Sequence, residues 1–334
     1  MMELAPIPPM NLSQKLRYGA EAALFFAFMG FFRVLGVDAA SALGGFMGRE
    51  IFYRTGTMTR ARNNLRAAFP EKTAIEIEAI IREMCDNLGR TTAEYAHLDK
   101  FRMTGRNPRL QIANIEIVDR VLASGKGILF ISGHFANWEM MPFAAAQYGL
   151  EGGEVYRPLN NPYVDRWMVR QRMINGPKEQ IAKGAQGTRR IFTLLRGGKC
   201  IYLLVDQKTN EGLAVSFFGR DAMTTPAPAA LALKLGAILL PASNERLGGA
   251  RFRMTVHEPI EFTPTGNHDR DVLALTVKIN QAIEDCVRYR PSQWLWIHRR
   301  WPKAGDKPRT RRGREAQALA GAGVGVERDG SSLS

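Results

Sequence analysis

The sequence has little cysteine and no arrangement of residues that suits a resident metal. Its three cysteines, Cys85, Cys200 and Cys286, are odd in number and lie far apart. This usage suits a reducing compartment and excludes a disulfide framework. The sequence also lacks an internal repeat, a P-loop, a dinucleotide-binding glycine motif and a zinc pattern. Repeat architectures, the common nucleotide-binding enzymes and zinc proteins are therefore excluded.

Acidic residues are scarce relative to basic ones. Asp and Glu total 32 against 46 Lys and Arg, which gives a net charge of +14. Such an excess indicates an anionic partner, which is a nucleic acid, an anionic membrane surface, or an acidic protein or lipid. Composition is otherwise ordinary for a globular protein, and 334 residues suffice for one large domain or two small ones.

Long apolar runs are missing, with a partial exception near the N-terminus. The stretch 18–37 is apolar apart from Glu21 and Arg33 near its ends. A spanning helix needs about 20 apolar residues, and charged residues near the ends can reach the interfaces. We expect residues 1–40 to form an uncleaved membrane anchor that spans the bilayer or lies in its interface. A cleaved signal peptide and a buried core helix are the alternatives.

The rest of the chain is organised around residues 127–139, GILFISGHFANWE. The apolar run predicts a buried strand that ends at a Ser-Gly pair and delivers His134, after which a helix begins. The carboxyl edge of an open α/β sheet is where such folds hold their sites. A histidine with a nearby carboxylate is a general base with an orienting partner, so Glu139 is the expected partner. A purely structural histidine is the alternative.

From residue 110 onward, predicted strands and helices alternate, which favours a mainly parallel sheet with crossover helices. Two further predicted strands end at chemically active side chains, one at Arg157 and one at Asp206 and Gln207. Because parallel strands end at one edge of the sheet, these residues are expected to converge with His134. A structural ion pair between Arg157 and Asp206 is the alternative.

The segment Gly-His-Phe-x-Asn-Trp-Glu, which includes Asn137, resembles the signature of the lysophospholipid acyltransferase superfamily. In this fuller form it resembles the late (secondary) lipid A acyltransferases of Gram-negative bacteria. The resemblance extends over residues 15–303. Further segments that carry it are R-x-N-L-x-x-x-F-P at 62–70, Tyr-Arg-Pro at 156–158, Asp-Gln at 206–207, Phe-Phe followed by threonines at 217–225, and the block 291–301. The chain departs from the family at Pro226-Ala227, where glycine is common.

The resemblance implies a glycerol-phosphate-acyltransferase-like α/β fold, with a mainly parallel sheet flanked by helices behind an N-terminal anchor. It implies an acyltransferase domain at 41–303, while composition predicts a disordered basic tail at 304–334. It places the protein on the cytoplasmic face of the inner membrane. The implied partners are acyl carrier protein as acyl donor, a lipid A precursor as acceptor and the anionic membrane surface. Neither a nucleic acid nor a metal or organic cofactor is expected.

The expected mechanism begins when His134 takes the proton from the acceptor hydroxyl while Glu139 orients the imidazole. The oxygen then attacks the thioester carbonyl directly, without an acyl-enzyme. Arg157 is expected to bind anionic groups of the acceptor or to stabilise developing negative charge. Asp206 is expected to position Arg157 or a substrate hydroxyl. Gln207 and Asn137 complete the predicted substrate-binding set.

Several alternatives stay open at this stage. The chain is either a lipid A acyltransferase, another phospholipid or glycolipid acyltransferase that uses a CoA or carrier thioester, or a non-catalytic basic protein that binds membranes or nucleic acid. Phe217 and Phe218 line an acyl-chain groove or pack in the core. Trp294, Trp296 and Trp301 form an interfacial belt beside anionic lipid or pack in the core.

Overall fold

The computed structural model describes residues 7, 9–209 and 212–301, so the tail predicted at 304–334 lies outside the described residues. The helices are α1 (Leu12–Leu35), α2 (Val37–Glu50), α3 (Met58–Ala68), α4 (Ala74–Glu94), α5 (Ile115–Leu122), α6 (Met140–Gln147), α7 (Pro162–Asn175), α8 (Ala185–Arg196), α9 (Ala227–Leu235) and α10 (His268–Tyr289). Short 3-10 helices are η1 (Phe52–Arg54), η2 (Tyr95–Lys100) and η3 (Pro291–Gln293). The strands are β1 (Leu110–Ala113), β2 (Ile128–Ser132), β3 (Gly152–Tyr156), β4 (Glu179–Ala182), β5 (Cys200–Leu204), β6 (Leu213–Phe217), β7 (Arg220–Thr224), β8 (Ile238–Gly248) and β9 (Arg251–Val256).

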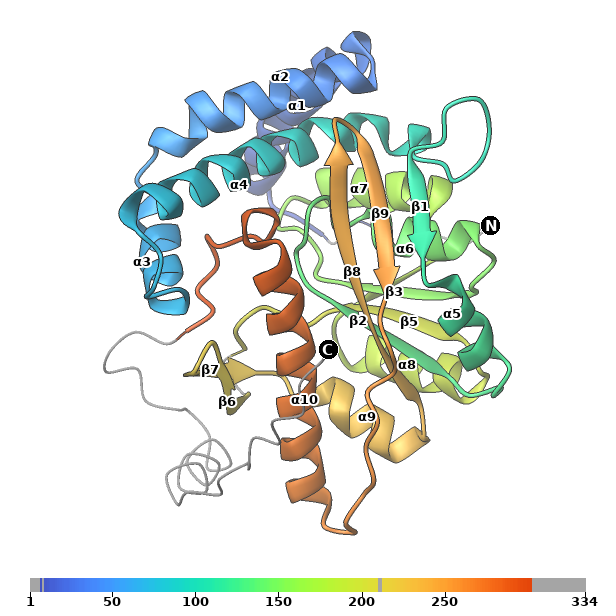
Figure 1. Cartoon of the computed structure of the whole chain (residues 1–334). Helices are drawn as coiled ribbons and strands as arrows, with labels where there is room; N and C mark the ends of the chain where they lie inside the picture. The colour runs from blue at the N-terminus through green and yellow to red at the C-terminus, as the bar shows by residue number, and fades with distance from the viewer. Residues whose placement is uncertain (1–6, 8, 210–211, 302–334) are drawn as a thin grey trace.

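One seven-stranded sheet forms the centre of the fold, with the order β1-β9-β8-β2-β5-β3-β4 (Figure 1). All neighbouring strands run parallel except β8 and β9, which are antiparallel. β6 and β7 form a separate antiparallel hairpin. The predicted α/β class with a mainly parallel sheet is therefore confirmed.

The central strand β2 is buried along its whole length. Because side chains alternate along a strand, its residues supply two hydrophobic cores, one on each face of the sheet. Leu129 and Ile131 join a core built with α3, α4, α8, α9 and α10. Ile128 and Phe130 join a core built with α5 and α6 on the other face. Burial on both faces explains the continuous apolar run in the sequence.

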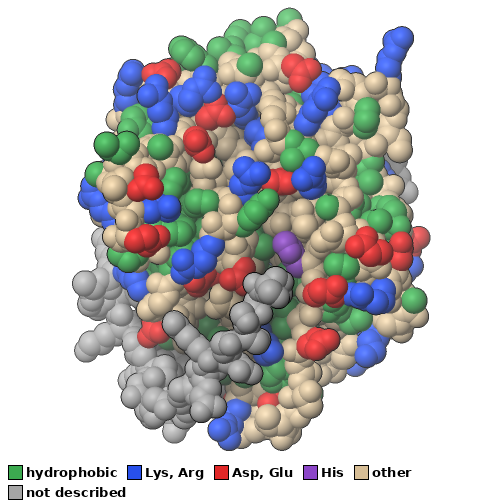
Figure 2. All heavy atoms as spheres, viewed as in Figure 1, with side chains coloured by type: hydrophobic (Ala, Val, Ile, Leu, Met, Phe, Trp, Pro, Cys, Tyr) green, Lys and Arg blue, Asp and Glu red, His purple; other side chains and the backbone are tan. Residues whose placement is uncertain are grey.

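Helix α1 lies along the body of the protein and packs through a single stripe of side chains. Ala22, Met29 and Phe32 are buried, whereas Phe31 and Val34 are 54% and 87% exposed. The helix is long and apolar enough to cross a membrane, and only 17% of its most apolar window is buried. It is therefore no core helix, because its outward surface is apolar and uncovered by the described residues. Figure 2 shows hydrophobic side chains at the surface along the upper edge, where Figure 1 places α1 and α2.

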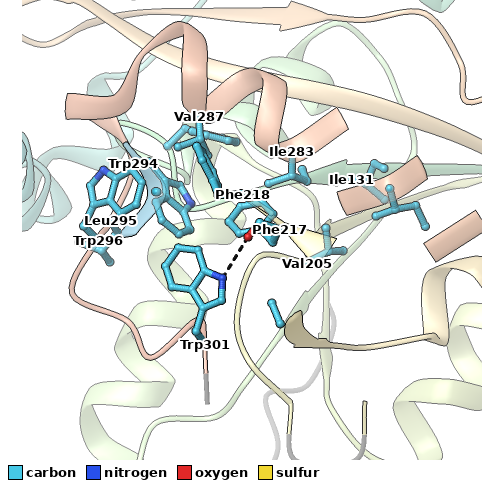
Figure 3. Close-up of a cluster of buried hydrophobic side chains, with 14 of the residues drawn as sticks. Ile131, Val205, Phe217, Phe218, Ile283, Val287, Trp294, Leu295, Trp296 and Trp301 are labelled. Atoms are coloured by element: carbon cyan, nitrogen blue, oxygen red, sulfur yellow. Dashed lines mark hydrogen bonds between the residues drawn. The ribbon is translucent and has the colours of Figure 1, made fainter. Parts of the chain in front are cut away.

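The C-terminal tryptophans and the Phe-Phe pair belong to the core, and this decides both alternatives left open by the sequence. Trp294, Trp296 and Trp301 are 1%, 0% and 6% exposed, and Phe217 and Phe218 are 0% and 6% exposed. Figure 3 shows these rings pointing toward one another, with the Trp301 indole donating a hydrogen bond of 3.1 Å to the Phe217 carbonyl. An interfacial belt and an acyl groove lined by these phenylalanines are thus both excluded.

Candidate active site

His134 and Asp206 form the centre of the candidate site at the carboxyl edge of the sheet. Strand β2 delivers His134, and its parallel neighbour β5 delivers Asp206, so the two residues follow adjacent strand ends. Nδ1 of His134 lies 2.8 Å from Oδ1 of Asp206. The imidazole is 13% exposed and the carboxylate 1% exposed. A buried carboxylate therefore holds an imidazole that still reaches solvent.

The second imidazole nitrogen of His134 is an acceptor. The side-chain amide nitrogen of Gln207 lies 3.2 Å from Nε2 of His134 and 3.2 Å from Nε2 of His298. An ionised carboxylate can only accept, so in the neutral imidazole of His134 Nδ1 carries the proton and Nε2 keeps a lone pair to which the Gln207 amide can donate. Nδ1 of His134 therefore keeps its proton and donates a hydrogen bond to Asp206. This is the tautomer that a general base requires.

Three donors hold Asp206 in its charged form. The His134 ring, the His134 backbone N–H at 2.7 Å and the Trp294 indole N–H at 2.8 Å all donate to the carboxylate. Burial by itself would raise the pKa of Asp206, but the charge and hydrogen bonds of His134 outweigh burial and hold that pKa well below its usual range. Gly133 leaves room for this arrangement, since a Cβ there would lie 3.1 Å from Oδ2 of Asp206.

The loop after His134 is pinned in an unusual conformation. Ala136 adopts a positive φ of 47°, which is costly for a residue with a side chain. Its carbonyl accepts hydrogen bonds from Asn87 and Thr91 of α4, at 3.1 and 3.2 Å. Its N–H donates to the Gln293 carbonyl at 2.7 Å. Two segments remote in sequence therefore fix the loop that carries the histidine.

Glu139 does not orient the imidazole, so that prediction is wrong. Its side chain is fully buried and accepts two hydrogen bonds from Arg172 of α7, at 2.8 and 2.6 Å. The hydroxyl of Tyr95 donates a third, at 2.7 Å. The reason is geometric: Glu139 directly precedes α6, and the intervening loop turns it toward α7, away from β5. Glu139 thus holds Arg172, whose guanidinium lines the cavity beside His134.

Asp206 and Asn137 also have contacts that differ from those predicted, while Arg157 lies where its predicted role requires no such contact. Asp206 bonds His134 and Trp294, and no hydrogen bond or ion pair joins it to Arg157 within the described residues, so both the predicted positioning of Arg157 and the alternative ion pair are wrong. Arg157 is exposed at the cavity rim. Asn137 is fully buried and donates to Glu94 at 3.0 Å, so in this conformation it supports the loop without reaching a cavity.

Two cavities meet at this edge of the sheet. The first, of about 460 Å³, is lined by His134, Tyr95 and Arg172. The second, of about 600 Å³, lies between α8 and α9 and has a mainly apolar lining. That lining includes Val155, Ile191, Phe192, Leu203 and Leu231. Arg157 and Gln207 line both cavities and mark their border.

Several site residues were not selected from the sequence. Arg172 lies on α7 with Arg166 and Arg170, and nothing in the local sequence pattern distinguishes it from these two. His298 and Trp294 stood in the C-terminal block, more than 80 residues after Asp206 in sequence. The ring of His298 lies 5.2 Å from that of His134, and burial, followed by the neighbouring charge of His134, lowers its pKa to about 4. His298 is therefore neutral at physiological pH.

A largely buried carboxylate beside Arg172 makes the folding stability depend on pH. Nε of Arg172 lies 3.8 Å from Oε1 of Glu154. Burial, opposed by Arg172 and reinforced by the charge of Glu139, raises the pKa of Glu154 to about 7. Folding thus favours the protonated form, so the stability this group contributes is full below its unfolded pKa of about 4.5 and is lost as pH rises through about 7.

We expect Glu154→Gln to remove this pH dependence. The amide keeps the shape of the carboxyl and carries no charge, so the variant gains roughly 3 kcal/mol of stability relative to wild type as pH rises from about 4.5 to about 7. Chemical denaturation across this pH range measures the difference. Glu151→Gln is the control, because that neighbouring side chain is 74% exposed. Parallel pH curves for wild type and Glu154→Gln would contradict the assignment.

A solvent-reaching imidazole, a buried partner carboxylate and an adjoining apolar cavity are the arrangement expected of an enzyme that activates a hydroxyl beside an apolar chain. The model of the bacterial lipid A biosynthesis acyltransferase family matches residues 10–303. The chain belongs to this family and is an acyltransferase of lipid A biosynthesis.

Individual relatives have low sequence identity to this chain, but their alignments cover most of it. The lipid A biosynthesis lauroyltransferase of Escherichia coli is 25% identical over 244 residues, which cover 71% of this chain and 76% of the relative. The E. coli myristoyltransferase is 25% identical over 258 residues, or 76% and 77%. The phosphatidylinositol mannoside acyltransferase of Mycobacterium tuberculosis is 22% identical over 259 residues, or 76% and 80%.

Proposed function

We propose that this protein transfers a fatty acyl group from acyl carrier protein to a hydroxyl of a lipid A precursor. The transfer takes place at the cytoplasmic face of the inner membrane of a Gram-negative bacterium. The observation that carries the proposal is the pair of His134 and Asp206, open to a cavity that adjoins an apolar one. The E. coli relatives named for lauroyl and myristoyl transfer support the acyl chain and the lipid A acceptor.

The chemistry follows from the tautomer of His134. Nε2 takes the proton of the acceptor hydroxyl, and Asp206 stabilises the imidazolium that forms. The oxygen attacks the thioester carbonyl, so a C–O bond forms. The C–S bond then breaks, and the imidazolium returns its proton to the leaving sulfur. Gln207 must release Nε2 when the acceptor hydroxyl arrives, because both need the same lone pair.

Each of the two cavities suits a different substrate group. The apolar cavity between α8 and α9 suits the acyl chain, because both helices begin at the carboxyl edge and lead away from the reacting centre. The cavity lined by Arg172 suits the acceptor headgroup. Arg157, exposed at their border, is placed to bind an anionic group of the acceptor. Glu139 acts as a positioning residue, since it holds the guanidinium of Arg172.

A second candidate acceptor is favoured by one observation. The mycobacterial relative is named for phosphatidylinositol mannoside acylation, which is the acylation of a different glycolipid. Mass spectrometry of lipid A from cells with and without the gene separates the two candidates. We expect the loss of one acyl chain from lipid A in the deletion strain. Unchanged lipid A with an altered phospholipid or glycolipid would select the second acceptor class.

We predict direct transfer, without an acyl-enzyme. A covalent route would need a nucleophile, and the candidates are Ser132, two residues before His134, and Cys200 on the neighbouring strand β5; both are buried, at 1% and 2% exposure. Burial also raises the pKa of Cys200 to about 12, so its thiolate is scarce. Ser132→Ala and Cys200→Ala are each expected to retain most activity.

Intact-mass measurement tests this directly. Protein incubated with acyl carrier thioester and no lipid acceptor is expected to keep its unmodified mass. An acyl adduct that disappears in Ser132→Ala or Cys200→Ala would contradict direct transfer. His134 would then serve to activate that nucleophile.

A further inference from the structure

A cavity of about 450 Å³ lies where the end of α1, the start of α2 and η2 meet. Its charged lining is entirely basic and consists of Arg33, Lys100 and Arg109. His97, Asn107, Gly36 and Val37 complete the described lining. Among the described residues, none lines both this cavity and the one that contains His134. It is therefore a separate site whose surface suits an anion.

The three basic side chains differ in how many of their N–H donors are already hydrogen-bonded to carboxylates of the protein. Arg109 is 6% exposed and donates to both carboxylate oxygens of Asp38, at 2.7 and 2.6 Å. Arg33 and Lys100 share Asp99, a single carboxylate. Their side chains are 48% and 55% exposed. These two cations therefore retain donors that a ligand can use.

Two groups of the protein interior add to this surface. His97 is 2% exposed and donates from Nε2 to the Phe32 carbonyl at 2.9 Å, while its Nδ1 has no hydrogen-bond partner within the described residues. Helix α2 begins at Gly36 without a side-chain cap, so its first N–H groups and the positive end of its dipole are at the cavity. The helix N-terminus favours an oxygen-rich anion such as a phosphate, whereas Nδ1 of neutral His97 carries a lone pair and can accept a hydrogen bond from a headgroup hydroxyl.

The flank of the cavity is apolar and exposed. Phe31, Val34 and Leu35, in the last turns of α1, are 54%, 87% and 38% exposed. Val34 and Leu35 directly follow Arg33 in the chain, so basic and apolar surfaces meet within one helical turn. A free inorganic anion makes no use of such a flank. A ligand with a phosphate and hydrocarbon chains uses both surfaces.

We propose that this cavity binds the headgroup phosphate of an anionic glycerophospholipid, whose acyl chains lie along the outward face of α1. The site is separate from acyl transfer and rests on the membrane location proposed above. It fixes the end of α1 at the depth of the phosphates and so sets the orientation of the enzyme on the bilayer. Binding is measurable without turnover, so its failure is distinguishable from failure of the proposed reaction.

The test uses the full chain in neutral detergent micelles, titrated with phosphatidylglycerol or phosphatidylcholine while the melting temperature is recorded. Phosphatidylglycerol is expected to raise the melting temperature and phosphatidylcholine to leave it unchanged, because a ligand that binds the folded state stabilises it. Lys100→Gln is expected to raise the half-saturating phosphatidylglycerol concentration about fivefold. Lys126→Gln makes the same charge change at an exposed position just before β2, outside the lining of this cavity, and is expected to leave the half-saturating concentration unchanged.

A second variant and a second ligand separate the possible outcomes. Val34→Asn keeps all charges at a highly exposed position, and it is expected to weaken phosphatidylglycerol binding. Equal effects of Lys100→Gln and Lys126→Gln would overturn the proposal in favour of general charge attraction. The proposal would also be overturned, in favour of a free-phosphate site, if inorganic phosphate raised the melting temperature as much as phosphatidylglycerol does and Val34→Asn did not weaken phosphatidylglycerol binding.

Discussion

Asp206→Asn is expected to lower kcat for acyl transfer by about 10³–10⁴-fold while the protein still folds. The amide keeps the size of the carboxylate but loses its charge. Two N–H donors bond Oδ2, so the remaining oxygen of the amide is expected there; the amide NH2 group then faces Nδ1 and favours the wrong tautomer of the imidazole. It also removes the charge that stabilises the imidazolium in the transition state. Steady-state kinetics on the purified variant measure the loss, and its melting temperature reports folding.

Trp294→Phe is the graded control for this prediction. It deletes one of the three donors to Asp206 and keeps an aromatic ring in the core. It is expected to reduce kcat about tenfold, since one charge-assisted hydrogen bond contributes about 1.5–3 kcal/mol. An Asp206→Asn variant with near-wild-type kcat would show that the carboxylate has no part in the reaction.

His134→Ala is expected to lower kcat by about 10²–10⁴-fold, the usual contribution of a positioned general base. The variant should fold, because the backbone N–H of His134 and the Trp294 indole still donate to the buried Asp206. Acyl transfer at saturating substrate measures the loss.

His298→Ala is the matched comparison for the second imidazole. This ring contacts Gln207 and lies beside His134, so its removal is expected to have the smaller effect. If His134→Ala keeps its activity and His298→Ala loses it, the role of base belongs to His298.

The sequence predicted the sheet well where burial was complete. The central strand β2 and its neighbour β5 were identified from their apolar runs, because strands covered on both faces need continuous apolar residues. The edge strand β4 was not identified. It is only four residues long and mostly half-buried, so it carries no strong pattern. The antiparallel continuation of β8 into β9 likewise depends on pairing and not on local composition.

The partner of His134 could not be identified from the sequence. Glu139 was nearer in the chain and matched the His-x4-acid pattern, whereas Asp206 is 72 residues away. Proximity in the chain was overridden because β5 lies beside β2, while the loop around Ala136 turns Glu139 toward Arg172. The same argument applies to Trp294, whose contact with Asp206 exists only after the C-terminal segment has packed across the sheet edge.

The sequence by itself determined the class of fold, the histidine at the end of a buried strand, and an apolar N-terminal helix. Periodicity and composition suffice for these, because each reflects burial within one segment of chain. Only the tertiary structure decided which carboxylate meets the imidazole, that Glu139 pairs with Arg172, and that the tryptophans lie in the core. The physical reason is that hydrogen bonds and ring contacts act over a few ångströms, and strand order sets which residues lie within that range.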